Sequence, residues 1–539
     1  MVATGAPGAD TLVEPVVGAA GAGPDATDAD APGPLPSGDD VGTPERWVHR
    51  IGLAVFGVQF AGLVVLSAFT WRRFTLGVDF AIFNQAWTLI GTGHLDPASS
   101  LHGTPFLKNH FELIMWPLAL LRPLVRSPFV LLVVQDLALV GTEVLVFVWV
   151  TRLLRRSGLS TGWVVGGTLG ILVLLLADPG VYSTVVEDFH FEALATFFVV
   201  FAALDLWSGR TRRMWVWVVL GLSCGDIAGL YVFGLGLSAL TVPRARRHGL
   251  ALTLVGLAWV VVISVLGANV GSNVSDGYAY LAGRTSLPGG LRGLVLIGAG
   301  ALTHPSRWVH IGSARFGTAA RYVLNGGGIG VVTPWGFAVP LVVLGTSAFQ
   351  YDGIFIGLPF QNFVVLPFVA FGSAWMVVWL ASRARSVTGR RVAAAVGVLA
   401  VLCGVVTSAQ RLPAALTFNG SAGFVAGPDA AALAQVLART PHDAEVIAPL
   451  PTIGRFGSRR SVYLLVDRTP GSHTVVPVDA TTVVVVFDPA IAPVLLPGDT
   501  NGALQARLEG QGAQVLVRTP GVTALLWHPP AGTTSLELP

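Results

Sequence analysis

Residues 76–112, LGVDFAIFNQAWTLIGTGHLDPASSLHGTPFLKNHFE, decide how the rest of the chain is organised. An apolar segment, 51–71, leads into this stretch, and a second apolar segment, 128–150, leads away from it. The loop between them is dense in polar side chains and contains Lys108, the only lysine of the 539 residues. Charged groups are costly at membrane depth, and those that are retained often line polar cavities. We therefore expect this loop to hold the chemistry of a membrane protein.

Composition indicates that most of the chain is surrounded by lipid. Hydrophobic residues make up 53% of the sequence, charged residues only 12%, and the mean hydropathy is +0.68. Soluble domains contain about 25% charged residues. The net charge of +3 does not indicate nucleic acid as a partner, because the arginines cluster in short loops between apolar runs, where membrane orientation explains them.

The distribution of apolar segments divides the chain into three regions, the third of which begins at residue 410. Residues 1–44 are rich in Gly, Ala, Pro and Asp, so we expect a disordered cytoplasmic tail. Residues 45–409 are expected to form a transmembrane domain with an amino terminus in the cytoplasm and large outer loops at 72–127 and 269–313. A helix needs about 20 apolar residues to cross the hydrocarbon layer.

The transmembrane domain is predicted to contain about 11 helices. The run 214–242 is interpreted as two short helices turning at Ser223–Asp226, because only a pair keeps the flanking arginine clusters on one side. Within the first loop, FELIMWPLALL is too short to span and is predicted to be an interfacial helix. The expected spans are 51–71, 128–150, 162–177, 191–207, the pair in 214–242, 250–268, 314–332, 335–349, 363–380 and 392–408.

From residue 410 onward the composition becomes that of a soluble protein. AEVIAPL, SVYLLV, TTVVVVFDP, AQVLVRT and VTALLWH favour strands, and 429–439 and GALQARLEG favour helices. We expect residues 410–539 to form a small extracytoplasmic α/β domain. The domain has no GxGxxG or P-loop spacing, so nucleotide binding is not predicted.

The expected topology brings several ionisable groups to the outer face. Asp79 follows the first span, the cluster EDFHFE opens the fourth span, and Asp226 lies in a short turn. Asp79, Asp188 and His190 could bind a divalent cation or polarise a hydroxyl, although no spacing here is a metal signature. Capping of an interfacial helix is the alternative for Asp79, and capping of the fourth span is the alternative for Asp188 and His190. Solvation of the turn is the alternative for Asp226.

Three motifs resemble the bacterial membrane-protein family called domain of unknown function 2079. The family's D-x-x-x-F-x-Q pattern is matched by Asp79, Phe83 and Gln85, and its H-F-x-x-x-x-x-P pattern by His110, Phe111 and Pro117. Its D-x-F-H-x-E-x-x-A pattern is matched with Glu187 in the first position, followed by Phe189, His190, Glu192 and Ala195. A family Lys-Glu-Asp cluster is replaced by Cys224-Gly225-Asp226, so only the acid at Asp226 carries over.

The family is similar in layout to the GT-C membrane glycosyltransferases, and this resemblance implies a function. It implies transfer of a sugar from a polyprenyl-phosphate-linked donor to a glycan, lipid or protein acceptor at the outer face of the bacterial plasma membrane. Asp79, Asp188 and His190 would be catalytic, with Asp79 as the base and a divalent cation as a possible cofactor. Substrate-binding residues would be Gln85, Lys108, His110, Glu112, Glu187, Glu192, Asp226 and Arg284.

A non-enzymatic membrane protein, either a transporter or an envelope-assembly partner, is the alternative. A transporter is expected to have ionisable residues near the middle of the bilayer and often repeated halves. The sequence contains no internal repeat, and its acids are expected at one face, which favours the enzyme over the transporter but leaves the assembly partner open.

Overall fold

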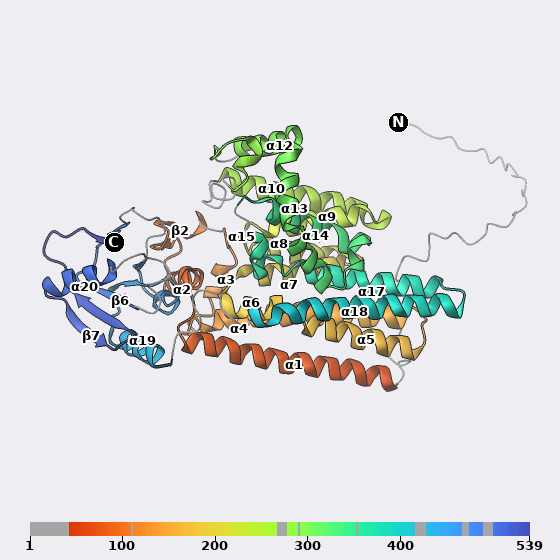
Figure 1. Ribbon diagram of the computed structural model, residues 1–539, viewed down its shortest axis with the longest axis horizontal. Coiled ribbons are helices and arrows are strands. Elements are labelled where there is room, and N and C mark those ends of the chain that lie inside the picture. The colour runs from red at the N-terminus through yellow and green to blue at the C-terminus, as the bar shows by residue number, and fades with distance from the viewer. Residues whose placement is uncertain are drawn as a thin grey trace, which may run out of the picture. The chain divides into compact units, whose positions relative to one another are not determined.

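The computed structural model describes residues 43–108, 111–266, 277–288, 291–351, 354–415, 427–465, 474–488 and 500–538 (Figure 1). All but the last two residues of the expected tail, 1–44, lie outside this set. The chain is mainly helical, with a small sheet near its carboxyl end.

The first helices run back and forth between two ends of the helical region. Helix α1 packs against α4, α5 and α6, and α4 packs against α7. The Arg155 side chain near the end of α4 donates a hydrogen bond of 2.9 Å to the Glu45 carbonyl, so the beginning of α1 lies beside the end of α4. These elements are α1 (Thr43–Arg72), α2 (Val78–Gly91), α3 (Met115–Ala119), α4 (Phe129–Arg156), α5 (Thr161–Leu176), α6 (Pro179–Glu187) and α7 (Phe191–Trp207).

The later helices include the expected short pair. Helices α8 and α9 are separated by a turn over 223–227, which confirms the interpretation of the run 214–242. The elements are α8 (Thr211–Leu222), α9 (Ala228–Leu240), η3 (Pro243–Ala245), α10 (Arg246–Val265), η4 (Ala279–Ala282), α12 (Leu291–Thr303), α13 (Pro305–Asn325), η5 (Ile329–Val332), α14 (Pro334–Phe349), α15 (Ile354–Gly357), α16 (Pro359–Asn362), α17 (Val365–Arg383) and α18 (Val387–Ala415).

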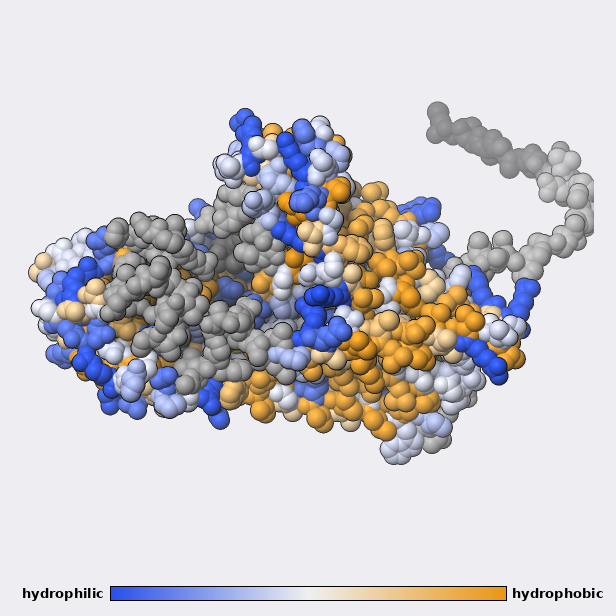
Figure 2. All heavy atoms as spheres, viewed as in Figure 1, coloured by the Kyte–Doolittle hydropathy of each residue, from blue (hydrophilic) through white to orange (hydrophobic). Residues whose placement is uncertain are grey.

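The expected count of about 11 spans is not confirmed. Within the described ranges, six helices are long and apolar enough to cross a membrane, and three shorter apolar helices accompany them. Helices α5 and α6 together form one of the six, Thr161–Glu187. The apolar side chains that the helices leave exposed, such as Val58 and Val65 of α1, are consistent with contact to lipid. Figure 2 shows such hydrophobic residues gathered over the helical part of the chain.

Two expected helices are wrong in extent. The predicted span 314–332 is not one helix, because α13 begins at Pro305 and ends at Asn325, and a separate turn of 3₁₀ helix follows. Gly327 and Gly328 have positive φ angles of 88° and 73°, which end the helix between the two parts. The predicted interfacial helix in FELIMWPLALL is reduced to the five residues of α3.

The sheet near the carboxyl end has five strands in the order β4-β3-β6-β8-β7. Strand β3 is parallel to β4 and β6, whereas β8 is antiparallel to β6 and β7. The five strands are β3 (Glu445–Ala448), β4 (Val462–Leu464), β6 (Val483–Phe487), β7 (Gln514–Arg518) and β8 (Thr523–Trp527). The helices of this part of the chain are α19 (Gly427–Arg439) and α20 (Thr500–Gly510). The sequence analysis did not predict strands β5 (Thr474–Pro477) and β9 (Ser535–Leu538), which form an antiparallel pair.

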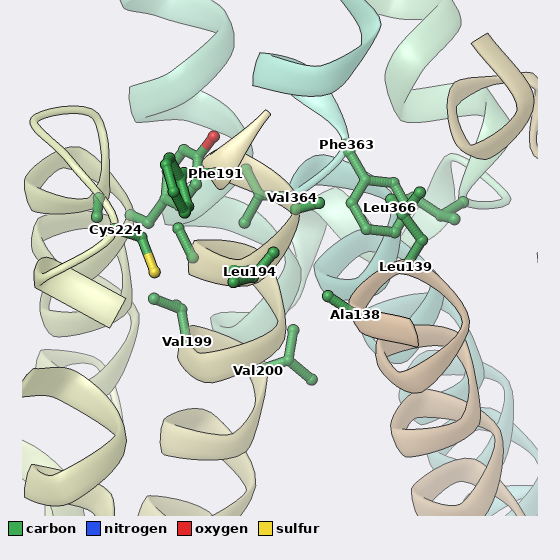
Figure 3. Packing of buried hydrophobic residues seen from close by; sticks show 14 of the residues in the cluster. Ala138, Leu139, Phe191, Leu194, Val199, Val200, Cys224, Phe363, Val364 and Leu366 are labelled. Atoms are coloured by element: carbon green, nitrogen blue, oxygen red, sulfur yellow. The ribbon is translucent and has the colours of Figure 1, made fainter. Parts of the chain in front are cut away.

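Separate apolar cores stabilise the two parts. Side chains from α4, α7 and the beginning of α17 interlock in the helical core, where Leu139, Leu194 and Leu366 are buried (Figure 3). In the sheet, all five residues of β6 are buried, as expected of a central strand covered on both faces. The core on one side of the sheet also contains Phe74 and Ala81, which belong to the beginning of the chain.

Candidate functional site

Six acidic residues lie at one end of the helices, and we call them the acid cluster: Asp79, Glu112, Glu187, Asp188, Glu192 and Asp226. They come from the connection between α1 and α4, the junction between α6 and α7, and the turn between α8 and α9. The arginine-rich connections after α4, α7 and α9 lie at the other ends of the same helices. In the structure, acids from three separate connections therefore lie near one another at the same end of the helices.

Glu112 and Asp226 meet because the connection before α3 packs onto the turn before α9. The Ile114 amide donates a hydrogen bond of 2.8 Å to the Ser223 carbonyl, and the Trp259 indole donates one of 3.1 Å to the Gly225 carbonyl. Phe111 has a φ angle of 58°, uncommon for a residue with a side chain, and its ring contacts Trp259 at 5.6 Å. These contacts turn Glu112 inward, where only 4% of its surface is exposed.

Burial and neighbouring negative charges disfavour the ionised form of these carboxyl groups. Burial raises the pKa of Glu112 well above its ordinary value, and the neighbouring carboxylates of Asp226, Glu192 and Asp79 raise it further. Burial also raises the pKa of Asp226 to about 6. Glu112 and Asp226 therefore keep their protons to a higher pH than exposed carboxyl groups do, and shifted pKa values of this kind are common where side chains take part in chemistry.

Asp188 joins the acid cluster to the first turn of α2. One oxygen of its carboxylate accepts a hydrogen bond of 3.1 Å from the Gly77 amide, and the other accepts one of 3.1 Å from the Phe189 amide. The pKa of Asp188 is raised well above its ordinary value, first by burial and then by the Asp79 carboxylate. Asp188 therefore caps α2, whose first turn contains Asp79, and does so from a distant part of the chain.

Gln135, inside the apolar helix α4, fixes the junction that carries Asp188 and His190. Its amide nitrogen donates to the Asp188 carbonyl at 3.0 Å, and its amide oxygen accepts from the His190 backbone amide at 2.6 Å. The His190 ring stacks on Phe360 of α16, with centroids 3.4 Å apart, and is buried. Sequence reasoning missed Gln135, although a polar residue inside an apolar span is a recognised signal of function.

The other predicted substrate-binding residues do not all lie in the cluster. Gln85 is buried, and its amide nitrogen donates to the carbonyls of Arg459 and Arg460 near the sheet. Lys108 is exposed at the end of η2 (Phe106–Lys108), a turn that lies against α2 through a contact of 6.3 Å between Phe106 and Phe83. Arg284 is exposed after η4, and no contact among the described residues ties it to the acid cluster; His110 lies outside the described residues.

The possible cation has no ready site in the described ranges. Nowhere in them do three or more His, Cys, Asp or Glu side chains form a group that could hold a metal ion. The two oxygens of Asp188 face backbone amides, which is the arrangement of a helix cap and not of a metal ligand.

The fold and the acid cluster define a multi-pass membrane protein with a cluster of acidic side chains at one end of its helices. The chain belongs to the family described as predicted membrane protein (DUF2079), whose model matches residues 71–465. The matched range contains all six acids of the cluster.

Two solved structures of ArnT from Cupriavidus metallidurans are similar to the chain. The structure bound to undecaprenyl phosphate has 12% sequence identity and a TM-score of 0.38, with 88% of this chain and 99% of ArnT covered. The apo structure has 13% identity and a TM-score of 0.40, with 89% and 100% covered. No curated protein matches the chain in sequence.

Proposed function

We propose that the protein is a GT-C-like glycosyltransferase that moves a sugar from a polyprenyl-phosphate-linked donor to an envelope acceptor at the outer face of the plasma membrane. One observation supports it most strongly: six acids from three separate connections converge at the end of the helices opposite the arginine-rich loops. Sugar transfer to a hydroxyl needs a positioned carboxylate that accepts a proton.

Asp79 is our choice for the base. It is half-buried, in the first turn of α2, while the adjacent Asp188 is almost fully buried. When two carboxyl groups share a site, the more buried one retains its proton more strongly, and the other carries the negative charge. Asp79 would accept the acceptor's hydroxyl proton. The acceptor oxygen would then bond to the anomeric carbon, whose bond to the phosphate oxygen breaks and releases the polyprenyl phosphate.

The remaining residues receive roles that agree with their contacts. Asp188 and His190 would act as positioning residues, because Asp188 caps α2 and the His190 ring packs on Phe360. Lys108 would contact the donor phosphate as a point charge, since it is exposed directly after a turn that packs on α2. Glu112, Glu187, Glu192 and Asp226 would contact the sugar or the acceptor, and a cation would be required only if the substrates supply further ligands.

The test is the variant Asp79→Asn, which keeps the shape of the side chain and removes the base. We expect transfer from undecaprenyl-phosphate-linked sugars, measured in membranes that contain the protein, to fall about 100-fold or more. Asp443→Asn, an exposed acid near the beginning of β3, is the matched control and should transfer at the wild-type rate. Wild-type transfer by Asp79→Asn would reject the role of Asp79.

A transporter is the second candidate, and one observation favours it. Asp136 and Glu143 are buried within α4, and Asp178 is buried between α5 and α6, and both segments are long and apolar enough to span the membrane. Ionisable residues in such positions often line pathways for ions or protons. Flux of a labelled sugar phosphate or of protons in proteoliposomes, lost in Glu143→Gln and kept in Asp79→Asn, would support transport and contradict the enzyme.

A further inference from the structure

Helix α2 presents two different faces to its surroundings. Asp79 and Phe83 are four residues apart and therefore lie on one side of the helix. The Phe83 ring contacts Phe189 at 5.4 Å and Phe191 at 5.0 Å, so this side faces the junction that carries Asp188. The opposite side of α2 faces a different part of the molecule.

That opposite side contacts the loop that follows β3. The Asn84 side chain donates a hydrogen bond of 3.0 Å to the Gly454 carbonyl, in η6 (Ile453–Phe456). The Gly454 amide in turn donates one of 2.9 Å to the Leu76 carbonyl, just before α2. A side chain at Gly454 would bring its Cβ within 2.5 Å of the Leu76 oxygen, so only glycine allows the two backbones to approach this closely.

Gln85 forms a second attachment on the same side. Its amide nitrogen donates to the carbonyls of Arg459 and Arg460 at 3.1 and 2.8 Å, and its oxygen accepts from the Ser100 amide at 3.0 Å. The Ser100 hydroxyl exchanges hydrogen bonds with the backbone of Val462 in β4. The segment that contains Ser100 therefore lies along β4 at the edge of the sheet. Gln85 connects α2 to this segment and to the residues before β4.

Aromatic and apolar contacts complete the attachment. The Arg455 guanidinium lies over the rings of Phe74 at 4.2 Å and Trp71 at 4.7 Å, distances at which cation–π attraction operates. Phe74 and Ala81 are fully buried in the core on one side of the sheet. Because segments from both ends of the chain share one apolar core, separation of the sheet from α2 would expose that core to water.

We propose that the carboxyl-terminal sheet domain positions the acid site. Asn84 and Gln85 are the positioning residues, because their hydrogen bonds attach α2, and with it Asp79, to the sheet domain. The sheet domain holds one face of α2 while Asp188 caps its first turn, so Asp79 is fixed between them. Loss of either attachment allows the first turn of α2 to open and moves Asp79 from the acceptor. The catalytic half of this inference rests on the proposed function; the structural half does not.

The structural half is tested by hydrogen exchange on the full-length protein in detergent. The variant Gly454→Ala places a methyl group against the Leu76 carbonyl, and the matched control Gly510→Ala adds one at the end of α20, where nothing lies within 4 Å. We expect amides 77–81 to exchange about 10-fold faster in Gly454→Ala and at the wild-type rate in Gly510→Ala. Faster exchange in 449–457 without any change in 77–81 would overturn the proposal.

The catalytic half is tested with Gln85→Ala, which removes hydrogen bonds without adding bulk and therefore also serves if Gly454→Ala does not fold. We expect kcat for transfer to fall about 10-fold, with the KM for the donor unchanged, because Asp79 is displaced while the donor contacts remain. Wild-type kcat in Gln85→Ala, with Asp79→Asn inactive, would reject this inference and leave the proposed function intact. If wild-type protein transfers no sugar, the proposed function fails, and the exchange experiment still decides whether the sheet domain fixes α2.

Discussion

At the level of single residues, the acid cluster makes stability depend on pH in a specific direction. The pKa of Asp226 is raised from 3.8 to about 6 by burial, so the folded protein holds this proton more firmly than the unfolded chain does. Stability should therefore fall as the pH rises from about 4 to about 6. Glu112 and Asp188, whose pKa values are also raised, act with the same sign at higher pH.

Asp226→Asn removes this titration and preserves an oxygen that can accept the 2.8 Å hydrogen bond from the Ile227 amide. As the pH rises from 4 to 7, the difference in Tm between the variant and the wild type should grow by roughly 2 °C or more in favour of the variant. Thermal unfolding in detergent measures both Tm values. The exposed acid Asp443 provides the control variant Asp443→Asn, which should follow the wild type at every pH. Parallel Tm curves for Asp226→Asn and wild type would contradict the raised pKa of Asp226.

Gln135 offers a second prediction about a single side chain. In Gln135→Ala the Asp188 carbonyl and the His190 amide lose their buried partner, and each unpaired group costs roughly 1–3 kcal/mol. We expect a clear fall in Tm, accompanied by reduced transfer. Gln505→Ala, which removes a hydrogen bond to Glu509 on α20, is the matched control and should change stability by about 0.5 kcal/mol or less. Equal Tm values for the two variants would show that Gln135 does not hold the junction.

The sequence predicted the acids of the cluster but not what holds them. Costly charges beside apolar spans signalled Asp79, Asp188 and Asp226, and the order of the spans indicated that they share one end. The partners of Asp188 are backbone amides, and those of Gln85 are carbonyls nearly 375 positions away, so no residue pattern encodes these contacts. The family resemblance predicts that Gln85 binds substrate, and the structure adds that its hydrogen bonds connect α2 to the sheet.

At the level of elements, close packing of α9 against α10 sets the position of Asp226. Gly236 of α9 lies against the backbone of Thr253, and Gly256 of α10 lies against that of Phe233. Small residues on facing helices allow this approach in membranes, where packing replaces the hydrophobic effect as the driving force. The indole of Trp259, also on α10, then reaches the Gly225 carbonyl beside Asp226.

Gly236→Ala would bring a methyl carbon within 2.4 Å of the Thr253 nitrogen, so the helices must separate. We expect a loss of about 1–3 kcal/mol, seen as a lower Tm. The matched control Gly345→Ala lies in α14, where nothing is within 4 Å of the added carbon, and alanine there should be neutral or slightly stabilising. A wild-type Tm for Gly236→Ala would mean that α9 and α10 are not packed at this distance.

Element boundaries show which sequence signals were sufficient. The basic residues on both sides of 214–242 required an even number of crossings, and the pair α8 and α9 agrees with that requirement. Hydropathy alone predicts a single helix over 314–332, because apolar residues continue on both sides of the three glycines 326–328. The backbone conformation of Gly327 and Gly328 separates them, and a hydropathy pattern does not contain that information.

For the whole molecule, the remaining question is which side of the membrane receives the acid cluster. The arginine clusters after α4, α7 and α9 and between α17 and α18 favour the cytoplasm, so the cluster and the sheet domain should face outward. In a background without Cys224 and Cys403, we expect Gln514→Cys, exposed on β7, to react with a membrane-impermeant maleimide in intact cells. Arg385→Cys, exposed between α17 and α18, should react only after permeabilisation. The reverse pattern would place the acids in the cytoplasm, where an acceptor of the outer envelope does not reach Asp79, and the proposed transfer would have to be abandoned even if every contact around Asp79 is correct.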